Sequence, residues 1–173
     1  MQFFSGFSLQ NEELLFQEFV DNGNYSVCGF SYGAIKALQH TKKLLENAQR
    51  VDRLQLLSPA FFQTKSKKFR RLQVLAYSKN QEAYMKQFMH SCFAPYVQKE
   101  LEHTATSITQ LEELLEYQWQ ASDFLELEAK GVTIEVYLGA KDKIIDVENA
   151  RDFFLELSCV TYLKEANHFL QTK

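Results

Sequence analysis

The chain has 173 residues, of which 46% are hydrophobic, and its formal net charge is −3. That length and apolar content suit one domain with a sizeable core, so we expect a single domain over residues 1–173. The mildly acidic balance gives no overall signal for nucleic-acid binding, and no stretch approaches the ~20 apolar residues of a membrane span.

The three cysteines, Cys28, Cys92 and Cys159, fit no zinc-binding spacing, and their odd number does not suit a closed set of disulfides. Cys28 and Cys159 fall inside predicted strands, which favours buried free thiols. Free thiols are typical of a reducing compartment, and the sequence does not open with a basic and then apolar leader. We therefore expect a cytoplasmic protein without a metal site.

Short apolar segments alternate with amphipathic segments along the chain. Strands are expected near residues 1–4, 25–28, 53–57, 132–138 and 159–163, and helices over 11–20, 34–46 and 147–157. Asn11 and Asp146 are the predicted N-caps of the first and the last of these helices. Alternation of strands and helices indicates βαβ units, and hence an α/β fold with a mostly parallel sheet of about five strands and helices on both faces.

The segment from about residue 60 to 130 contains no convincing strand. Apolar residues recur at helical spacing over 79–93, and Ser107 with Gln110 forms the capping-box pattern that opens another helix. A helical insertion of this length at the functional edge of a sheet is typical of a lid, so we expect a helical lid insertion at about 60–130. Core packing against the sheet is the alternative role for its apolar side chains.

The residues Gly29-Phe30-Ser31-Tyr32-Gly33 fit the pattern G-x-S-x-G. The pattern follows a predicted strand and precedes a predicted helix, the context in which it places a nucleophilic serine on a sharp turn. We therefore expect Ser31 to be a catalytic nucleophile. A serine that merely caps a glycine-containing turn is the alternative interpretation.

A serine hydroxyl needs a base to remove its proton. Of the four histidines, only His168 follows the last predicted strand. His40 lies about three turns along the helix after Ser31, and His90 and His103 lie in the insertion. The chain order Ser…Asp…His expected of this pattern favours His168 as the base. A surface imidazole near the end of the chain is the alternative.

The carboxylate partner of His168 and the N–H groups that bind the oxyanion are expected at the same edge of the sheet. Asp142 follows the fourth predicted strand, and Asp146 is its rival for the role of the acid. We favour Asp142, because Asp146 already has a predicted capping role. The backbone N–H groups of Tyr32 and of Phe7, in the turn after the first strand, are the predicted oxyanion donors.

Together these motifs resemble those of the α/β-hydrolase family. Ser5-Gly6-Phe7-Ser8 is similar to its His-Gly-x-Gly oxyanion loop, with Ser5 in place of His. Gly139-Ala140-Lys141-Asp142 is similar to its acid turn, and Asn167-His168-Phe169 to its Gly-His-x turn. The chain is short for the family, which implies a minimal sheet. The small size, the elbow and the Asn-His-Phe ending also resemble the BioV-type pimeloyl-[acyl-carrier protein] methyl ester esterases.

That resemblance implies a carboxylic-ester hydrolase of biotin biosynthesis with a Ser-His-Asp triad and no cofactor. It would cleave the methyl ester of pimeloyl-[acyl-carrier protein] and release methanol. Its partner would be the acyl-carrier protein; we expect a monomer with no nucleic-acid or membrane partner. Two alternatives stay open: a small general carboxylesterase or thioesterase with a free acyl substrate, and a non-catalytic binding protein with this fold.

One charged segment bears on a carrier-protein partner. Residues 65–71 concentrate five cations in seven residues: Lys65, Lys67, Lys68, Arg70 and Arg71. Carrier proteins are acidic, so this cationic cluster is a candidate surface for attracting and binding one near the entrance of the site. A solvated surface without a partner is the alternative, because charge runs are often no more than that.

Overall fold

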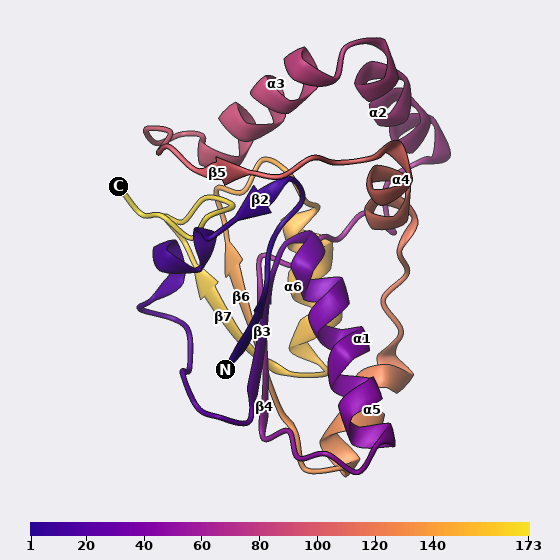
Figure 1. Cartoon of the computed structure of the whole chain (residues 1–173), viewed down its shortest axis with the longest axis vertical. Helices are drawn as coiled ribbons and strands as arrows, with labels where there is room; N and C mark the ends of the chain where they lie inside the picture. Colours follow the sequence, from indigo (N-terminus) through magenta and orange to yellow (C-terminus); the bar gives the residue numbers. More distant parts are fainter.

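A sheet of five strands forms the centre of the molecule, in the order β1-β3-β4-β6-β7. The computed structural model describes all residues, 1–173 (Figure 1). The strands are β1 (Gln2–Phe4), β3 (Ser26–Phe30), β4 (Arg53–Leu57), β6 (Thr133–Gly139) and β7 (Cys159–Leu163). Every neighbouring pair is parallel. The α/β fold class predicted from the sequence is therefore confirmed.

The two faces of this sheet are covered in different ways. One face packs against three α-helices, which lie on the same side of the sheet in Figure 1: α1 (Tyr32–Glu46), α5 (Ala121–Ala129) and α6 (Val147–Leu155). The opposite face is covered by the 3-10 helix η1 (Glu12–Phe16) and by the segment after β7. Because side chains alternate along a strand, Leu54 and Leu56 of β4 join the first core and Leu57 joins the second.

The segment between β4 and β6 holds four helices and one short strand. These are α2 (Lys67–Lys79), α3 (Gln81–Phe93), β5 (Glu102–His103), α4 (Ile108–Glu116) and α5. The helices α2, α3 and α4, which we call the insertion helices, lie beyond the end of the sheet where β3 and β6 finish (Figure 1). Strand β5 pairs with β2 (Leu9–Gln10) in an antiparallel ribbon. Helix α5 packs on the sheet instead, through Phe124 and Leu127, so only the part before it stands over the sheet edge.

Local sequence signals account for the starts of the insertion helices. Ser107 and Gln110 form the predicted capping box, with each side chain accepting the backbone N–H of the other at 3.2 and 3.0 Å. The side-chain oxygens of Ser66 and Asn80 likewise accept an N–H from the first turns of α2 and α3. None of the helices combines the length and the apolar character needed to cross a membrane.

The predicted helix over residues 11–20 is wrong in its extent, although its first turn follows the predicted N-cap position at Asn11. Only η1 is helical there, and Asn11 has a left-handed φ of 61° and makes no capping hydrogen bond. Beyond η1 the backbone is held against β4, because Gln55 Nε2 donates to the carbonyl of Phe19 at 2.9 Å. A tertiary contact therefore replaces the later turns of the expected helix.

The prediction of buried thiols is right for Cys28 and wrong for Cys159. All three cysteines are free; Cys28 and Cys92 are buried, whereas Cys159 is exposed. Cys159 begins β7, an edge strand with a neighbour on one side only. The sequence pattern of a strand does not reveal its position in the sheet, and that position decides how much of it is buried.

Aromatic side chains fill the core between the sheet and its three helices. Phe154 on α6 is fully buried, and its ring centroid lies within 5.8 Å of four other aromatic rings. These rings belong to Phe61, Trp119, Phe124 and Phe153. The indole Nε1 of Trp119 donates to the carbonyl of Ala60 at 2.9 Å, so the polar atom of this cluster is also satisfied.

We expect Phe154→Ala to lower the free energy of unfolding by about 3–5 kcal/mol, because it leaves a cavity among packed rings. Leu155→Ala is the matched control, since it removes the next side chain on the same helix, which is exposed. That change should alter stability by no more than about 0.5 kcal/mol. Urea denaturation followed by circular dichroism measures both values. Equal losses for the two variants would contradict this description of the core.

Candidate active site

Ser31 lies on a tight turn between the end of β3 and the start of α1. Its φ of 53° and ψ of −113° are unusual for a residue with a side chain, and such strained positions cluster at functional sites. A Cβ on Gly33 would lie 1.9 Å from the carbonyl oxygen of Phe4, and one on Gly29 would lie 2.2 Å from the carbonyl oxygen of Gly33. Glycine is therefore required on both sides of Ser31 for the turn to close.

Three side chains from the ends of three strands meet at this turn. His168 Nε2 lies 3.0 Å from Ser31 Oγ, and His168 Nδ1 lies 2.6 Å from Asp142 Oδ2. Ser31 follows β3, Asp142 follows β6 and His168 follows β7. Both Ser31 and His168 are buried, with 5% and 1% of their surface exposed. The structure therefore brings together the predicted nucleophile, base and acid in one hydrogen-bonded line.

The surroundings of Asp142 fix its carboxylate in place. Oδ1 accepts the backbone N–H groups of Ile144 and Ile145 at 2.7 and 3.3 Å, which leaves Oδ2 for the imidazole of His168. Backbone N–H groups that point at a carboxylate stabilise its negative charge. Asp142 Oδ2 can therefore accept the proton on Nδ1 of His168 in a hydrogen bond. This tautomer leaves Nε2 of His168 free to accept the proton of Ser31.

The rival acid, Asp146, points elsewhere. It occupies the predicted N-cap position of α6, but no side-chain capping hydrogen bond forms there. Its Oδ2 instead accepts from Thr64 Oγ1 at 2.8 Å and lies 3.7 Å from Lys65 Nζ. The capping position of Asp146 is therefore as predicted, and the hydrogen bond between His168 and Asp142 supplies a direct reason to prefer Asp142.

Asn167 anchors the loop that carries His168, a role that the sequence pattern around it does not indicate. The Asn167 amide donates to the carbonyl of Phe93 at 2.7 Å, and its oxygen accepts the N–H groups of Phe169 and Gln171 at 3.0 Å each. The backbone carbonyl oxygen of Asn167 lies so close to Gly139 that a Cβ on Gly139 would be 2.4 Å from it. These contacts tie the loop to α3 and to the end of β6, and so set the position of the imidazole.

The other three histidines lie away from Ser31. His40 on α1 packs against the ring of Phe4, with centroids 5.2 Å apart. His90 is exposed on α3, and His103 on β5 has Nδ1 at 3.2 Å from the carbonyl of Ser8. The chain also has no group of three or more His, Cys, Asp or Glu side chains that could hold a metal ion.

The two predicted oxyanion donors lie beside Ser31. The N–H of Phe7 makes no hydrogen bond in the structure, and the N–H of Tyr32 belongs to the first turn of α1, where N–H groups have no partner within the helix. The rings of Phe7 and Tyr32 contact each other edge to face at 6.3 Å. The contact of Gly33 with the carbonyls of Phe4 and Ser5 brings the two segments together. Neither N–H group is therefore used by a hydrogen bond within the protein.

An apolar cavity of about 340 Å³ lies between Phe7, the insertion helices and the loop after β6. This volume is within the range of small-molecule sites in proteins. Its apolar lining consists of Phe7, Phe62, Phe69, Ala76, Tyr84, Phe88, Leu111, Leu114, Leu115 and Ile144. Lys143 and three uncharged polar residues complete the wall. The insertion helices therefore provide an apolar chamber next to one of the candidate oxyanion donors.

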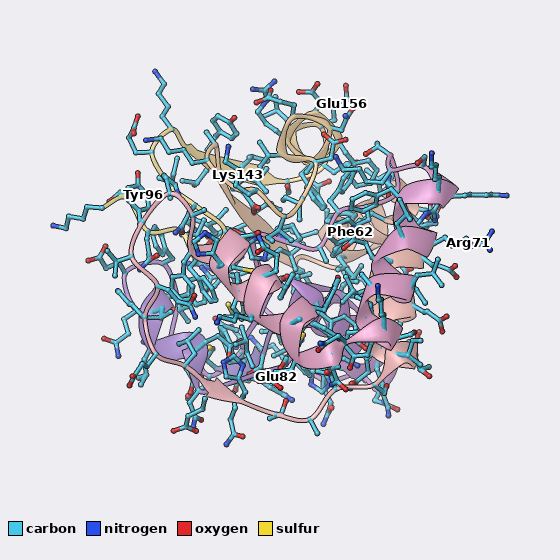
Figure 2. The ribbon with its side chains drawn as sticks, turned by 90° about the horizontal axis from the view of Figure 1, so that it is seen from above. Phe62, Arg71, Glu82, Tyr96, Lys143 and Glu156 are labelled. Atoms are coloured by element: carbon cyan, nitrogen blue, oxygen red, sulfur yellow. The ribbon has the colours of Figure 1, made fainter.

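The cationic cluster lies at the start of α2, on the outer side of this chamber. Lys65 pairs with Asp146, whereas the other four cations form no ion pair. Figure 2 shows Arg71 projecting outward from α2, whereas Phe62 lies nearer the centre of the molecule. The N-terminal end of a helix dipole is positive, so it is unfavourable to cations at the start of α2. The first turn of α2 contains no acidic residue that could offset them. Leu72 and Leu75 are half exposed beside them.

Comparison with known proteins gives matches at the level of structure. No protein-family model and no curated protein sequence matches the chain. A bromoperoxidase from Bacillus anthracis has a TM-score of 0.65 at 14% identity, over 91% of this chain and 64% of its own. A hydrolase from Oleispira antarctica has a TM-score of 0.60 at 16% identity, over 93% and 63%. A naproxen esterase from Bacillus subtilis has a TM-score of 0.54 at 17% identity, over 85% and 54%.

The chain thus spans between about half and two thirds of the length of these solved structures. The similarity extends over 85–93% of this chain and is one of overall fold, at 14–17% identity. With five strands in the sheet and the insertion between β4 and β6, the chain has a minimal α/β-hydrolase fold.

Proposed function

We propose that this chain is a serine ester hydrolase that forms an acyl-enzyme at Ser31. The observation that carries the proposal is the hydrogen-bonded line from Asp142 through His168 to Ser31 on a strained strand-to-helix turn. The fold alone would not support it, because one fold hosts many functions. A buried serine, imidazole and carboxylate in this order are the groups that acyl transfer requires.

The reaction follows from the positions of these atoms. Ser31 Oγ attacks the ester carbonyl and gives its proton to His168 Nε2, while Asp142 stabilises the imidazolium. The negative oxygen of the tetrahedral intermediate accepts the N–H groups of Phe7 and Tyr32. The alcohol leaves with the proton from His168, and water then hydrolyses the acyl-enzyme by the same steps. No cofactor takes part in this scheme.

The substrate we propose is the methyl ester of pimeloyl-[acyl-carrier protein], which places the reaction in biotin biosynthesis. Three features support it: the resemblance of the elbow and of the His168 turn to esterases of that group, the apolar cavity beside Phe7, and the cationic cluster on α2. The cavity suits a methylene chain, and the cluster suits an acidic carrier. We further propose that the protein acts as a monomer in the cytoplasm.

The first test compares two substrates and one variant. We expect hydrolysis of pimeloyl-carrier-protein methyl ester to be faster than that of a short p-nitrophenyl ester, measured as kcat/KM. Ser31→Ala should lower turnover by about 10⁴-fold or more, because the nucleophile is lost. Cleavage of the short ester alone would refute the carrier-linked substrate and favour a general carboxylesterase. Failure of wild-type protein both to cleave either ester and to react with a fluorophosphonate would favour a binding protein.

The two aspartates give a second test. We expect Asp142→Asn to lower kcat by about 10³–10⁴-fold, because an amide at this position favours the wrong tautomer of His168. Asp146→Asn is the control and should keep kcat within about threefold, since Asp146 makes no contact with His168. Steady-state kinetics of both variants on the same ester measures the difference. The assignment of the acid is wrong if Asp146→Asn loses activity and Asp142→Asn keeps it.

A third test concerns the cationic cluster. Reversing the three exposed cations Lys67, Lys68 and Arg71 to Glu should raise KM for the carrier-linked ester by about tenfold or more at low salt, because the acidic carrier would be repelled. The kinetics on the short ester should not change. Glutamate at the start of a helix is favourable to its dipole, so α2 should keep its structure in this variant.

The matched control reverses three exposed lysines outside α2 that form no ion pair: Lys43, Lys164 and Lys173. This variant has the same net charge as the first, so a general effect of charge would raise KM equally in both. Equal KM values in the two variants, or an unchanged KM in the α2 variant, would refute carrier binding at the cluster.

A further inference from the structure

A carboxyl group lies completely buried behind the turn that carries Phe7. Glu12, the first residue of η1, has no exposed surface. Its Oε1 accepts the backbone N–H of Gly6 at 2.6 Å, and its Oε2 has no hydrogen-bond partner. Burial raises the pKa of Glu12, and none of the ion pairs of the structure includes it. A buried carboxyl group with one unsatisfied oxygen is costly to stability.

The hydrogen bond between the Gly6 N–H and Glu12 holds the residue that precedes Phe7, the candidate oxyanion donor. On the other side of Gly6, its carbonyl accepts the N–H of Leu9 at 3.2 Å. The carbonyl of Gly6 and the N–H of Phe7 belong to one planar peptide unit and point in opposite directions. Holding Gly6 at its N–H and at its carbonyl therefore sets the direction of the Phe7 N–H.

The backbone of this turn also packs against the ring of Phe30. A Cβ on Gly6 would lie 2.8 Å from the ring of Phe30, so the backbone of the turn packs directly on the last residue of β3. The ring of Phe30 in turn packs on the imidazole of His168, with centroids 5.0 Å apart. The carboxyl group of Glu12 is thus the one side-chain acceptor that holds this turn from behind, at a point one residue from Phe7.

From these contacts we infer that Glu12 is a positioning residue, which aims the N–H of Phe7 at the oxyanion by binding the N–H of Gly6. The inference rests on the proposed function of Ser31, and it adds a residue that does not touch the substrate. A misplacement of about 1 Å in a catalytic group can lower a rate by about 100-fold. Loss of the hydrogen bond between Gly6 and Glu12 should therefore lower turnover more than it lowers the free energy of unfolding.

The test uses two substitutions of similar size. Glu12→Gln keeps a carbonyl oxygen that can accept the Gly6 N–H, whereas Glu12→Met fills the space without an acceptor. We expect Glu12→Met to lower kcat by about tenfold or more and to keep KM within about twofold of the wild-type value. Glu12→Gln should keep kcat within about threefold of wild type. Glu13→Gln, on the neighbouring carboxylate, is the control and should match wild type.

A second measurement separates this inference from the proposed function. The chain has six glycines, so a spectrum of protein labelled with ¹⁵N at glycine and phenylalanine can resolve the amides of Gly6 and Phe7. Both amide signals should move in Glu12→Met and stay near wild type in Glu12→Gln. If the wild type cleaves no ester, the proposed function fails while these spectra still test the contact. Unchanged amide signals in Glu12→Met, or an unchanged kcat in an active enzyme, would overturn the inference.

Discussion

The backbone around Ser31 passes so close to its neighbours that no side chain fits on either side of it. The space at Gly33 is taken by the carbonyl of Phe4, and the space at Gly29 by the carbonyl of Gly33. This close approach joins β1, β3 and α1 at one point and forces the unusual backbone of Ser31. The rest of the site is arranged around that point, because parallel strands end at the same edge of the sheet.

The same constraint recurs where Asp142 and His168 are held. Gly139 ends β6 against the backbone of Asn167, and Asn167 ties its loop to the end of α3. The position of His168 therefore depends on one backbone contact and on one buried amide with all of its partners in place. A fully satisfied buried polar group of this kind makes a loop rigid, which suits a base that must stay within hydrogen-bond distance of a serine.

The two groups of helices contribute to different parts of the molecule. Helices α1, α5 and α6 stabilise the sheet through an apolar core with the ring of Phe154 inside it. The insertion helices provide the apolar chamber and the unpaired cations, and no member of the Ser31–His168–Asp142 line. Cations at the positive end of the α2 dipole, on the outer side of the chamber, and a carboxyl group buried at Glu12, behind the turn of Phe7, both reduce stability.

Hydrophobic periodicity and the two glycines around Ser31 are local signals, and they predicted the α/β class, the five strands of the parallel sheet and the strand-to-helix turn at Ser31. The short strands β2 and β5 were not predicted. The sequence also singled out Asp142 and His168, which the structure brings into hydrogen-bond distance; their catalytic role stays a prediction. The extent of the helix expected at 11–20, the exposure of Cys159 and the partners of Asp146 emerge from the three-dimensional structure, as do the contacts made by Asn167 and Glu12. Each of these depends on contacts between distant segments, and a local pattern carries no information about which segments meet.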